Sequence, residues 1–382
     1  MDYLFNSFKV KYIILNKLFT KLDLRNVNSV TLYINLESLL NALHRNDYEE
    51  MLQTLTKEEL AGQCKQLIAN IVNLAGHYRL FFTRSKVPSN IIFYYQDFDT
   101  YKNFYNSLHV EKYRKHYFDM YHSSRFERVN DMILSSIPYA KSIIDYIEAV
   151  YLLKSETMEA SLIPLIGSQD KGLKSDLHIV LTKDLYDFQY VNYNFLILYP
   201  DKDESVMLHR YNVMKYLRYT HDMEESFKME LNPLLLPFMH AVLGDKKRSL
   251  EKIRGIGFKK LYRSLEKLYE TDFLDDENVL SFNIEHLGEL IKEAKFFNDN
   301  GVKETITSNY FAIHLDRQLN IVEPYIRTSV LDAAINKFDN NGLKRLNDKV
   351  FYDYPLHLVE LNSYHKKLMK DASELWMNSE SP

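Results

Sequence analysis

A glycine pair set among cationic residues is the pattern in this sequence best suited to binding chemistry. Residues 244–260 read GDKKRSLEKIRGIGFKK, in which Gly255 and Gly257 flank Ile256. Glycine permits positive φ and lets the backbone approach a ligand with no Cβ in between. We expect a short basic helix before the pair and a longer helix after it. The loop N–H groups and the N-terminus of the second helix in such a helix-hairpin-helix suit one phosphate.

Positive charge is concentrated in this same stretch. It holds seven Lys or Arg residues against two acids, a local balance of +5, whereas the whole chain is formally −4. A local basic patch is typical of a nucleic-acid interface. A solvated basic helix pair that binds nothing is the alternative interpretation. The candidate DNA-binding residues are Lys246, Lys247, Lys252, Arg254, Gly255, Gly257, Lys259 and Lys260.

Polar side chains also follow several predicted strands. Because the carboxyl ends of parallel strands meet at one edge of a sheet, and open α/β folds keep their sites there, these side chains are candidates for a shared site. The strands are expected over residues 30–34, 90–99, 178–181 and 195–200. The polar residues at their ends are Asn35, Glu37, Gln96, Asp97, Asp99, Asp184 and Asp187.

The predicted strands alternate with predicted helices, which favours an α/β fold with a doubly wound, mostly parallel sheet flanked by helices. The low content of Gly (10) and Pro (9) agrees with long helices. Helices are expected over residues 58–82, 143–153 and 158–166. The expected domains are a docking helix (1–27), an α/β domain (28–230), a helix-hairpin-helix subdomain (231–270) and a mainly helical C-terminal region (271–382).

Composition excludes several classes of protein. The single cysteine, Cys64, rules out an internal disulfide and a cysteine zinc cluster, and it favours a reducing compartment. No run of 18 apolar residues is present, and Lys9 and Lys11 interrupt the N-terminal apolar stretch. We therefore expect a protein without a signal peptide or membrane partner, cytoplasmic or virion-associated. No P-loop, G-x-S-x-G or H-E-x-x-H motif occurs.

Five segments, in order, resemble the flap-endonuclease or 5′-nuclease family, which has a PIN-like fold with a helix-hairpin-helix. The first two are YINLESLL at residues 33–40 and IIFYYQDFD at 91–99, the latter followed by the basic, tyrosine-rich EKYRKHYF at 111–118. That basic segment also fits an ordinary exposed amphipathic helix. The third is Glu159-Ala160-Ser161-Leu162, and the fourth spans residues 183–189. The last opens at Gly244-Asp245 and ends in the glycine pair followed by Phe258-Lys259.

The resemblance implies phosphodiester hydrolysis with two divalent cations, Mg²⁺ or Mn²⁺, held by many carboxylates. Of the family's acids, the positions that keep a carboxylate here are Glu159, Asp184 and Asp245. The positions that depart from the pattern are Asn35, Ser161, Leu162, Tyr186 and Arg248. An arginine in place of a carboxylate opposes metal occupancy. We therefore expect no catalytic residue, no metal ligand and no cofactor, although Glu37, Asp97, Asp99 or Asp187 could supply displaced carboxylates.

Two functions follow from this pattern. The first is a non-catalytic, DNA-binding or structural protein on a 5′-nuclease-like scaffold, with DNA or other proteins of a larger assembly, such as a bacteriophage particle, as partners. The alternative is an active 5′–3′ exonuclease or flap endonuclease with a rearranged acid cluster that uses Mg²⁺ or Mn²⁺.

Overall fold

The computed structural model describes part of the chain, and all statements below concern that part. The ranges are residues 27–37, helical positions 71, 74, 75, 78 and 82, and residues 87–97, 133–138, 140–141, 149–155, 160–169, 175–200, 205–221, 223, 230–245, 250–270 and 300–315. The predicted docking helix at 1–27 therefore lies almost wholly outside the described residues, as do the basic, tyrosine-rich segment at 111–118 and most of the C-terminal region.

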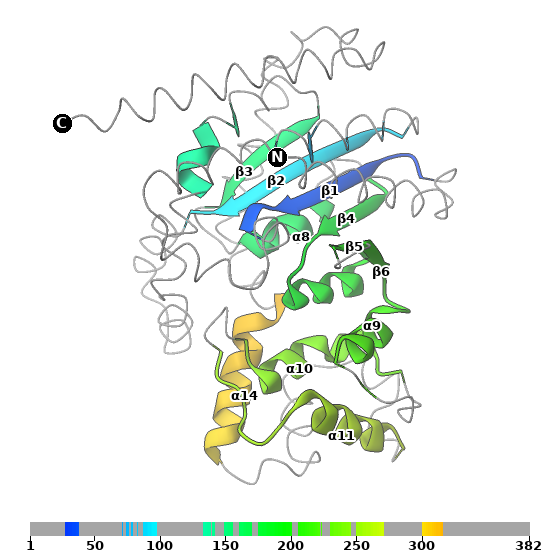
Figure 1. Cartoon of the computed structure of the whole chain (residues 1–382), viewed down its shortest axis with the longest axis vertical. Coiled ribbons are helices and arrows are strands. Elements are labelled where there is room, and N and C mark those ends of the chain that lie inside the picture. The colour runs from blue at the N-terminus through cyan, green and yellow to red at the C-terminus, as the bar shows by residue number, and fades with distance from the viewer. Residues whose placement is uncertain are drawn as a thin grey trace, which may run out of the picture.

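A six-stranded sheet forms one half of the described structure (Figure 1). Its strands are β1 (Val30–Asn35), β2 (Ser89–Gln96), β3 (Val150–Ser155), β4 (Leu177–Leu181), β5 (Phe195–Pro200) and β6 (Ser205–Leu208). The order is β3-β2-β1-β4-β5-β6, with every neighbouring pair parallel except β5 and β6. β1 and β2 are almost continuously buried because apolar strands of parallel sheets are covered on both faces. The predicted α/β class with a mostly parallel sheet is confirmed.

The third strand corrects the prediction of a helix over residues 143–153. The spacing of apolar residues there fits a helix, but Val150–Ser155 forms β3. Ala149 takes a positive φ of 56°, which ends any preceding helix, and its carbonyl accepts a hydrogen bond from Ile91 N at 2.8 Å. The chain is thereby turned into the sheet beside β2. The short antiparallel strand β6 was also not predicted.

Helix α8 (Ile163–Gln169) follows the short 3₁₀ helix η2 (Ala160–Leu162). The predicted helix over 158–166 therefore begins later within the described residues, which fits Pro164, a residue tolerated only in a first helical turn. α8 approaches the sheet closely at Gly167. A Cβ at that position would lie 2.5 Å from the Tyr33 hydroxyl.

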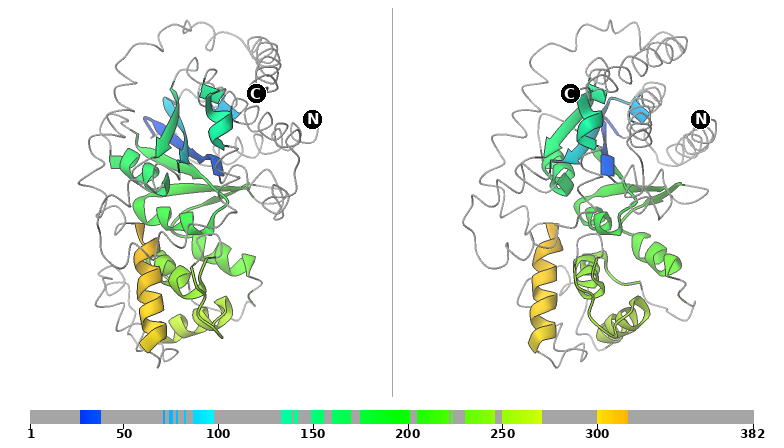
Figure 2. Two further views of the ribbon diagram at one scale, coloured as in Figure 1. Left: turned by 90° about the vertical axis from the view of Figure 1, so that its left-hand side faces the viewer. Right: turned by 60° about the vertical axis from the view of Figure 1, so that its left-hand side comes forward.

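A group of helices forms the other half of the described structure (Figure 1). It comprises η3 (Leu185–Tyr193), α9 (Val213–Thr220), η4 (Pro233–Leu235), α10 (Leu236–Leu243), α11 (Phe258–Glu270) and α14 (Asn300–Ile313). α14 runs beside α10 in both views of Figure 2, and Asn309 Nδ2 donates to the carbonyls of Ala241 and Glu251, both at 2.9 Å. Gln189 Nε2 donates to Ile313 O at 3.1 Å. These bonds join the helices to the segment that follows β4.

Among the described residues, no helix is both long enough and apolar enough to cross a bilayer.

Candidate functional site

The carboxyl edge of the sheet brings together polar residues from three strands. Asn35 ends β1 and is paired in register with Tyr94 of β2. Burial raises the pKa of the Tyr94 hydroxyl well above its ordinary value, and the charges of Asp187 and Asp184 raise it further, while interactions with Tyr190 and Asn35 lower it. These effects place both carboxylates of the segment after β4 near Tyr94. Asn35, Asp184 and Asp187 therefore all act on Tyr94 at the carboxyl edge of the sheet.

Asp184 holds the backbone at the start of η3. Its Oδ1 accepts a hydrogen bond from Tyr186 N at 3.0 Å, and its own backbone N–H donates to Thr182 Oγ1 at 3.0 Å. An aspartate in this position stabilises a helix because the first N–H groups of a helix have no partner within it. This hydrogen bond gives Asp184 a structural role at the start of η3.

Asp187 is buried one turn further along, with 1% of its surface exposed. The Thr182 hydroxyl donates to its Oδ2 at 2.5 Å, so one oxygen is held by the same threonine that positions Asp184. A buried carboxylate is costly unless it is hydrogen-bonded. Thr182 supplies such a bond and fixes the direction of the side chain.

Asn35 caps the turn that follows β1. Its Oδ1 accepts a hydrogen bond from Glu37 N at 2.9 Å, which is the contact of an N-cap asparagine with the helix that begins at Leu36. The amide carries no charge to offset that of a cation. Asn35 thus serves a structural role at the position where the family resemblance implies an acid.

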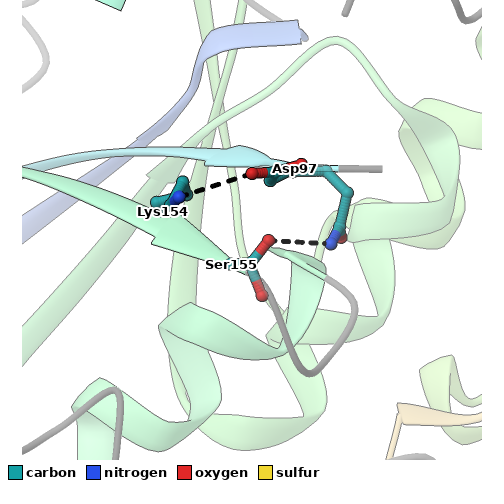
Figure 3. A network of polar contacts seen from close by, with 4 residues as sticks. Asp97, Lys154 and Ser155 are labelled. Carbon is teal, nitrogen blue, oxygen red and sulfur yellow. Dashed lines mark hydrogen bonds and ion pairs between the residues drawn. The ribbon is translucent and has the colours of Figure 1, made fainter. Parts of the chain in front are cut away.

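The end of β2 carries a separate polar network (Figure 3). Gln96 Nε2 donates to Ser155 O at 3.0 Å, and Gln96 Oε1 accepts from Ala160 N at 2.7 Å. Asp97 pairs with Lys154, whose Nζ lies 3.4 Å from Asp97 Oδ2. Asp97 has thus a cationic partner from β3, and Asp99 lies outside the described residues. This network fastens β3 and the start of η2 to β2.

Ser161 occupies a buried position close to this edge. Its Oγ has no hydrogen-bond partner among the described residues, and its carbonyl accepts from the Tyr190 hydroxyl. A hydroxyl adds no negative charge at the place where the family resemblance implies an aspartate. Glu159, two residues earlier, lies outside the described residues.

The described residues do not fit a two-metal site. Hard cations require several oxygen ligands, with anionic ones to offset the charge of two ions. Within the described ranges, no group of three His, Cys, Asp or Glu side chains is placed to hold a metal ion. Asp184 and Asp187 instead bond Tyr186 N and Thr182, and Asp97 pairs with Lys154.

Asp245 lies at the start of the hairpin, where it forms a small antiparallel bridge with Leu250. Its backbone N–H donates to Leu250 O at 3.2 Å, and Leu250 N donates to Asp245 O at 2.8 Å. The preceding Gly244 takes a φ of 68°, and a Cβ there would lie 2.7 Å from Leu250 O. These two backbone hydrogen bonds thus join the two ends of the loop between residues 245 and 250. Lys246, Lys247 and Arg248, between the bridging residues, lie outside the described residues.

The expected short basic helix before the glycine pair is absent from residues 250–257, which form the bridge, an extended stretch and a turn. The helix that precedes the hairpin is α10, an apolar helix that ends at Leu243. The prediction was wrong because the backbone of this arm is bonded elsewhere: Leu250 pairs with Asp245, and Ile253 N donates to Val242 O at 3.1 Å rather than to a carbonyl one turn earlier. The longer helix after the pair is confirmed as α11.

The turn between the two arms exposes its cations around an open backbone. Gly255 takes a φ of 75°, and no heavy atom lies within 4 Å of a Cβ placed on Gly255 or Gly257. Lys260 Nζ donates to Gly255 O at 3.3 Å and supports the turn. α11 begins directly afterwards, with Leu261 N donating to Gly257 O at 3.0 Å. The exposed cations of this part are Lys252, Arg254, Lys259 and Lys260.

Buried apolar side chains fix the hairpin to the core. Ile253, Ile256 and Phe258 are each at least nine-tenths buried and belong to the core formed by the helices. Ile253 N donates to Val242 O at 3.1 Å, which joins the loop to α10. The loop therefore has a fixed shape, with apolar side chains inward and cations outward.

Two exposed tyrosines next to this hairpin were missed at the sequence level. Tyr211 and Tyr219 expose 83% and 77% of their surface and lie at the two ends of α9. Tyr219 follows Lys215 by about one turn of α9, whereas Tyr211 lies in the turn that precedes the helix.

No protein-family model and no curated protein matches the sequence. Among solved structures, the chain is similar to the bacteriophage T5 flap endonuclease in a pseudo-enzyme–product complex with DNA and metal ions. The TM-score is 0.44 and the identity 11%, over 81% of this chain and 98% of that chain. A mutant of the T5 5′-exonuclease gives the same TM-score and coverage at 12% identity. The T5 5′-exonuclease with bound zinc ions gives the same TM-score and coverage at 11% identity. No residue role follows from these similarities.

Proposed function

We propose that this chain is a non-catalytic DNA-binding protein on a 5′-nuclease-like scaffold, with the hairpin between α10 and α11 as its contact with the DNA backbone. The observation that carries the proposal is the hairpin itself, in which buried isoleucines hold a turn whose charged side chains between residues 252 and 260 are all exposed cations. Phosphate groups are recognised by such a combination of cations and accessible backbone N–H groups.

The absence of catalysis rests on the carboxyl edge of the sheet. Asn35 and Asp184 cap the segments that follow β1 and β4, and Thr182 bonds Asp187. These bonds give the three side chains a role in stabilising the local backbone, and Asn35 adds no negative charge to offset that of a cation. The proposed domains are those predicted above, with the hairpin subdomain at residues 231–270. Other proteins of a larger assembly are proposed as further partners.

Binding is tested with fluorescence anisotropy of a labelled duplex at a series of salt concentrations. The double variant Lys252→Met with Lys259→Met should bind more weakly, and the slope of log affinity against log salt should fall by roughly two, because each lost phosphate contact removes about 0.9 of slope. Lys303→Met, an exposed lysine on α14, is the matched control and should leave the affinity and slope unchanged. An unaltered slope in the double variant would remove the hairpin from the interface.

Catalysis is tested separately with flap and nicked DNA in Mg²⁺ and in Mn²⁺. We expect no cleavage. Cleavage by the wild-type chain that Asp184→Ala abolishes would establish the alternative function, an active 5′-nuclease with a rearranged acid cluster.

A further inference from the structure

Helix α9 presents an exposed face on which aromatic and cationic side chains alternate. Tyr211, Lys215 and Tyr219 are all exposed, whereas Val213, Met214 and Leu217 of the opposite face are buried. The two tyrosines are the large hydrophobic side chains with the greatest exposure in the described part of the chain. Singly exposed apolar residues are ordinary, but here two aromatic rings and the lysine between them are exposed within one short segment.

The chain segment that carries this face is positively charged. Residues 205–221 contain Arg210, Lys215 and Arg218 and no acidic residue, and the acidic residues nearest in sequence are Glu204 before it and Asp222 after it. Arg210 and Lys215 are exposed next to the tyrosines. An exposed face with aromatic rings and positive charge suits a ligand that carries both several negative charges and flat, apolar groups.

The same helix is fixed against the hairpin. His221, which closes α9, stacks on Phe258, the first residue of α11, with ring centroids 4.0 Å apart. One turn back along α9 and one turn further along α11, Arg218 lies over the Tyr262 ring at 5.9 Å from the centroid. The C-terminal end of α9 therefore lies beside the start of α11, next to Lys259 and Lys260. A strand bound at Lys259 and Lys260 can therefore extend toward Tyr219 at the end of α9.

We propose that the α9 face, defined by Tyr211, Lys215 and Tyr219, binds single-stranded DNA by stacking of unpaired bases on the two tyrosine rings. Base–aromatic stacking is independent of sequence because every base has a π face, and cations between the rings contact the backbone. Tyr211 lies in the turn just before α9 and Tyr219 in the last turn of the helix, so the two rings can accept different bases of one strand. This rests on the proposed function, since the hairpin would hold the phosphates of the same strand or of an adjoining duplex.

The occupant is single-stranded rather than duplex because the bases of a duplex are stacked on each other and do not offer their faces to a side chain. A duplex would meet the cations of α9 but not its rings. The expected preference for single strands therefore depends on Tyr211 and Tyr219, whereas the salt dependence of binding depends on the lysines.

The test compares single-stranded oligothymidylate with a duplex of equal length, using the full chain. Tyr211→Ala with Tyr219→Ala should weaken single-strand binding at least about tenfold, since stacking is worth a factor of this order or more for each base. Tyr211→Phe with Tyr219→Phe keeps both rings and should stay within about threefold of the wild type. Duplex affinity should change little in either variant. Because both side chains are exposed, the melting temperature should be unaltered, which checks that the fold is intact.

A second readout follows the stacking itself. An oligonucleotide that contains 2-aminopurine should lose fluorescence on binding to the wild type and to the phenylalanine variant, but not on binding to the alanine variant. Equal single-strand affinity and equal quenching in the alanine variant would overturn the inference. If, in addition, the Lys252→Met and Lys259→Met variant binds all DNA normally, the proposed function fails too; if that variant still weakens binding, only the α9 face is excluded.

Discussion

The rings of His221 and Phe258 are stacked with centroids 4.0 Å apart and planes 7° apart. His221 closes α9 and Phe258 opens α11, so this pair joins the two helices at the position where the hairpin turns into α11. Phe258 is 8% exposed and also lies 5.9 Å, centroid to centroid, from the Tyr262 ring. The stack therefore holds the N-terminus of α11 in place for both proposed contacts with DNA.

Removal of the Phe258 ring from this stack should strongly destabilise the group of helices. Phe258→Ala should lower the free energy of unfolding by about 3 kcal/mol, because it removes a buried ring and leaves a cavity. Urea denaturation followed by circular dichroism measures the change. Lys259→Ala, on the neighbouring exposed position, should stay within about 0.5 kcal/mol of the wild type. A loss at Phe258 no greater than at Lys259 would show that the stack does not support α11.

The glycines of the hairpin should differ in their tolerance of alanine. Gly244→Ala should be the most harmful, because positive φ is combined with backbone atoms 2.7 Å from the new Cβ. Gly255→Ala meets open space but keeps the strain of φ 75°, about 1 kcal/mol. Gly257→Ala meets neither and should be nearly neutral. Melting temperatures that rank the three variants in another order would contradict this account of the loop.

Sequence patterns predicted the elements whose side chains are buried on both faces. The apolar runs of β1, β2, β4 and β5 were found, as was the place of Asn35 at the end of β1. β3 was missed because apolar spacing alone fits a helix there, and the positive φ of Ala149 is a property of the folded chain. The hairpin was found from its glycines, although its first arm is extended rather than helical.

The roles of the acids were less predictable than their positions. An Asp or Asn directly before a helix can cap the helix or bind a cation, and the amino-acid sequence does not distinguish the two roles. Only the contact of Asp184 with Tyr186 N and that of Asn35 with Glu37 N assign the capping role. In retrospect, Asn35 before an apolar helical run was already an N-cap signal.

The pH dependence of stability should carry a contribution from His178 at acid pH. Burial lowers the pKa of His178 below 6.5, and its ring packs against Phe195 at 5.2 Å between centroids. The folded state therefore takes up a proton less readily than the unfolded state, so the free energy of unfolding should fall as the pH drops below about 6.5. The loss is at most about 1.4 kcal/mol per pH unit for one group.

This contribution is isolated by comparison with His178→Gln, which cannot titrate. Urea denaturation of both proteins from neutral to mildly acid pH should show the wild type losing stability faster than the variant. If the free energies of unfolding of the two proteins change in parallel with pH, His178 takes up its proton with the same pKa in the folded and the unfolded chain. The comparison removes the other acid-sensitive groups because they are common to both proteins.

Asp184 offers a substitution that separates capping from metal binding. Asp184→Asn keeps an oxygen acceptor for Tyr186 N, so stability should change by less than about 0.5 kcal/mol, whereas Asp184→Ala should cost about 1 kcal/mol. Asn232→Ala is the matched comparison and should cost a similar amount, since Asn232 Oδ1 accepts a hydrogen bond from Leu234 N at 3.1 Å at the start of η4.

A carboxylate that bound a cation would respond differently. Adding Mg²⁺ or Mn²⁺ would then raise the melting temperature of the wild type but not that of Asp184→Asn, an outcome that contradicts the capping role as the sole function of this residue.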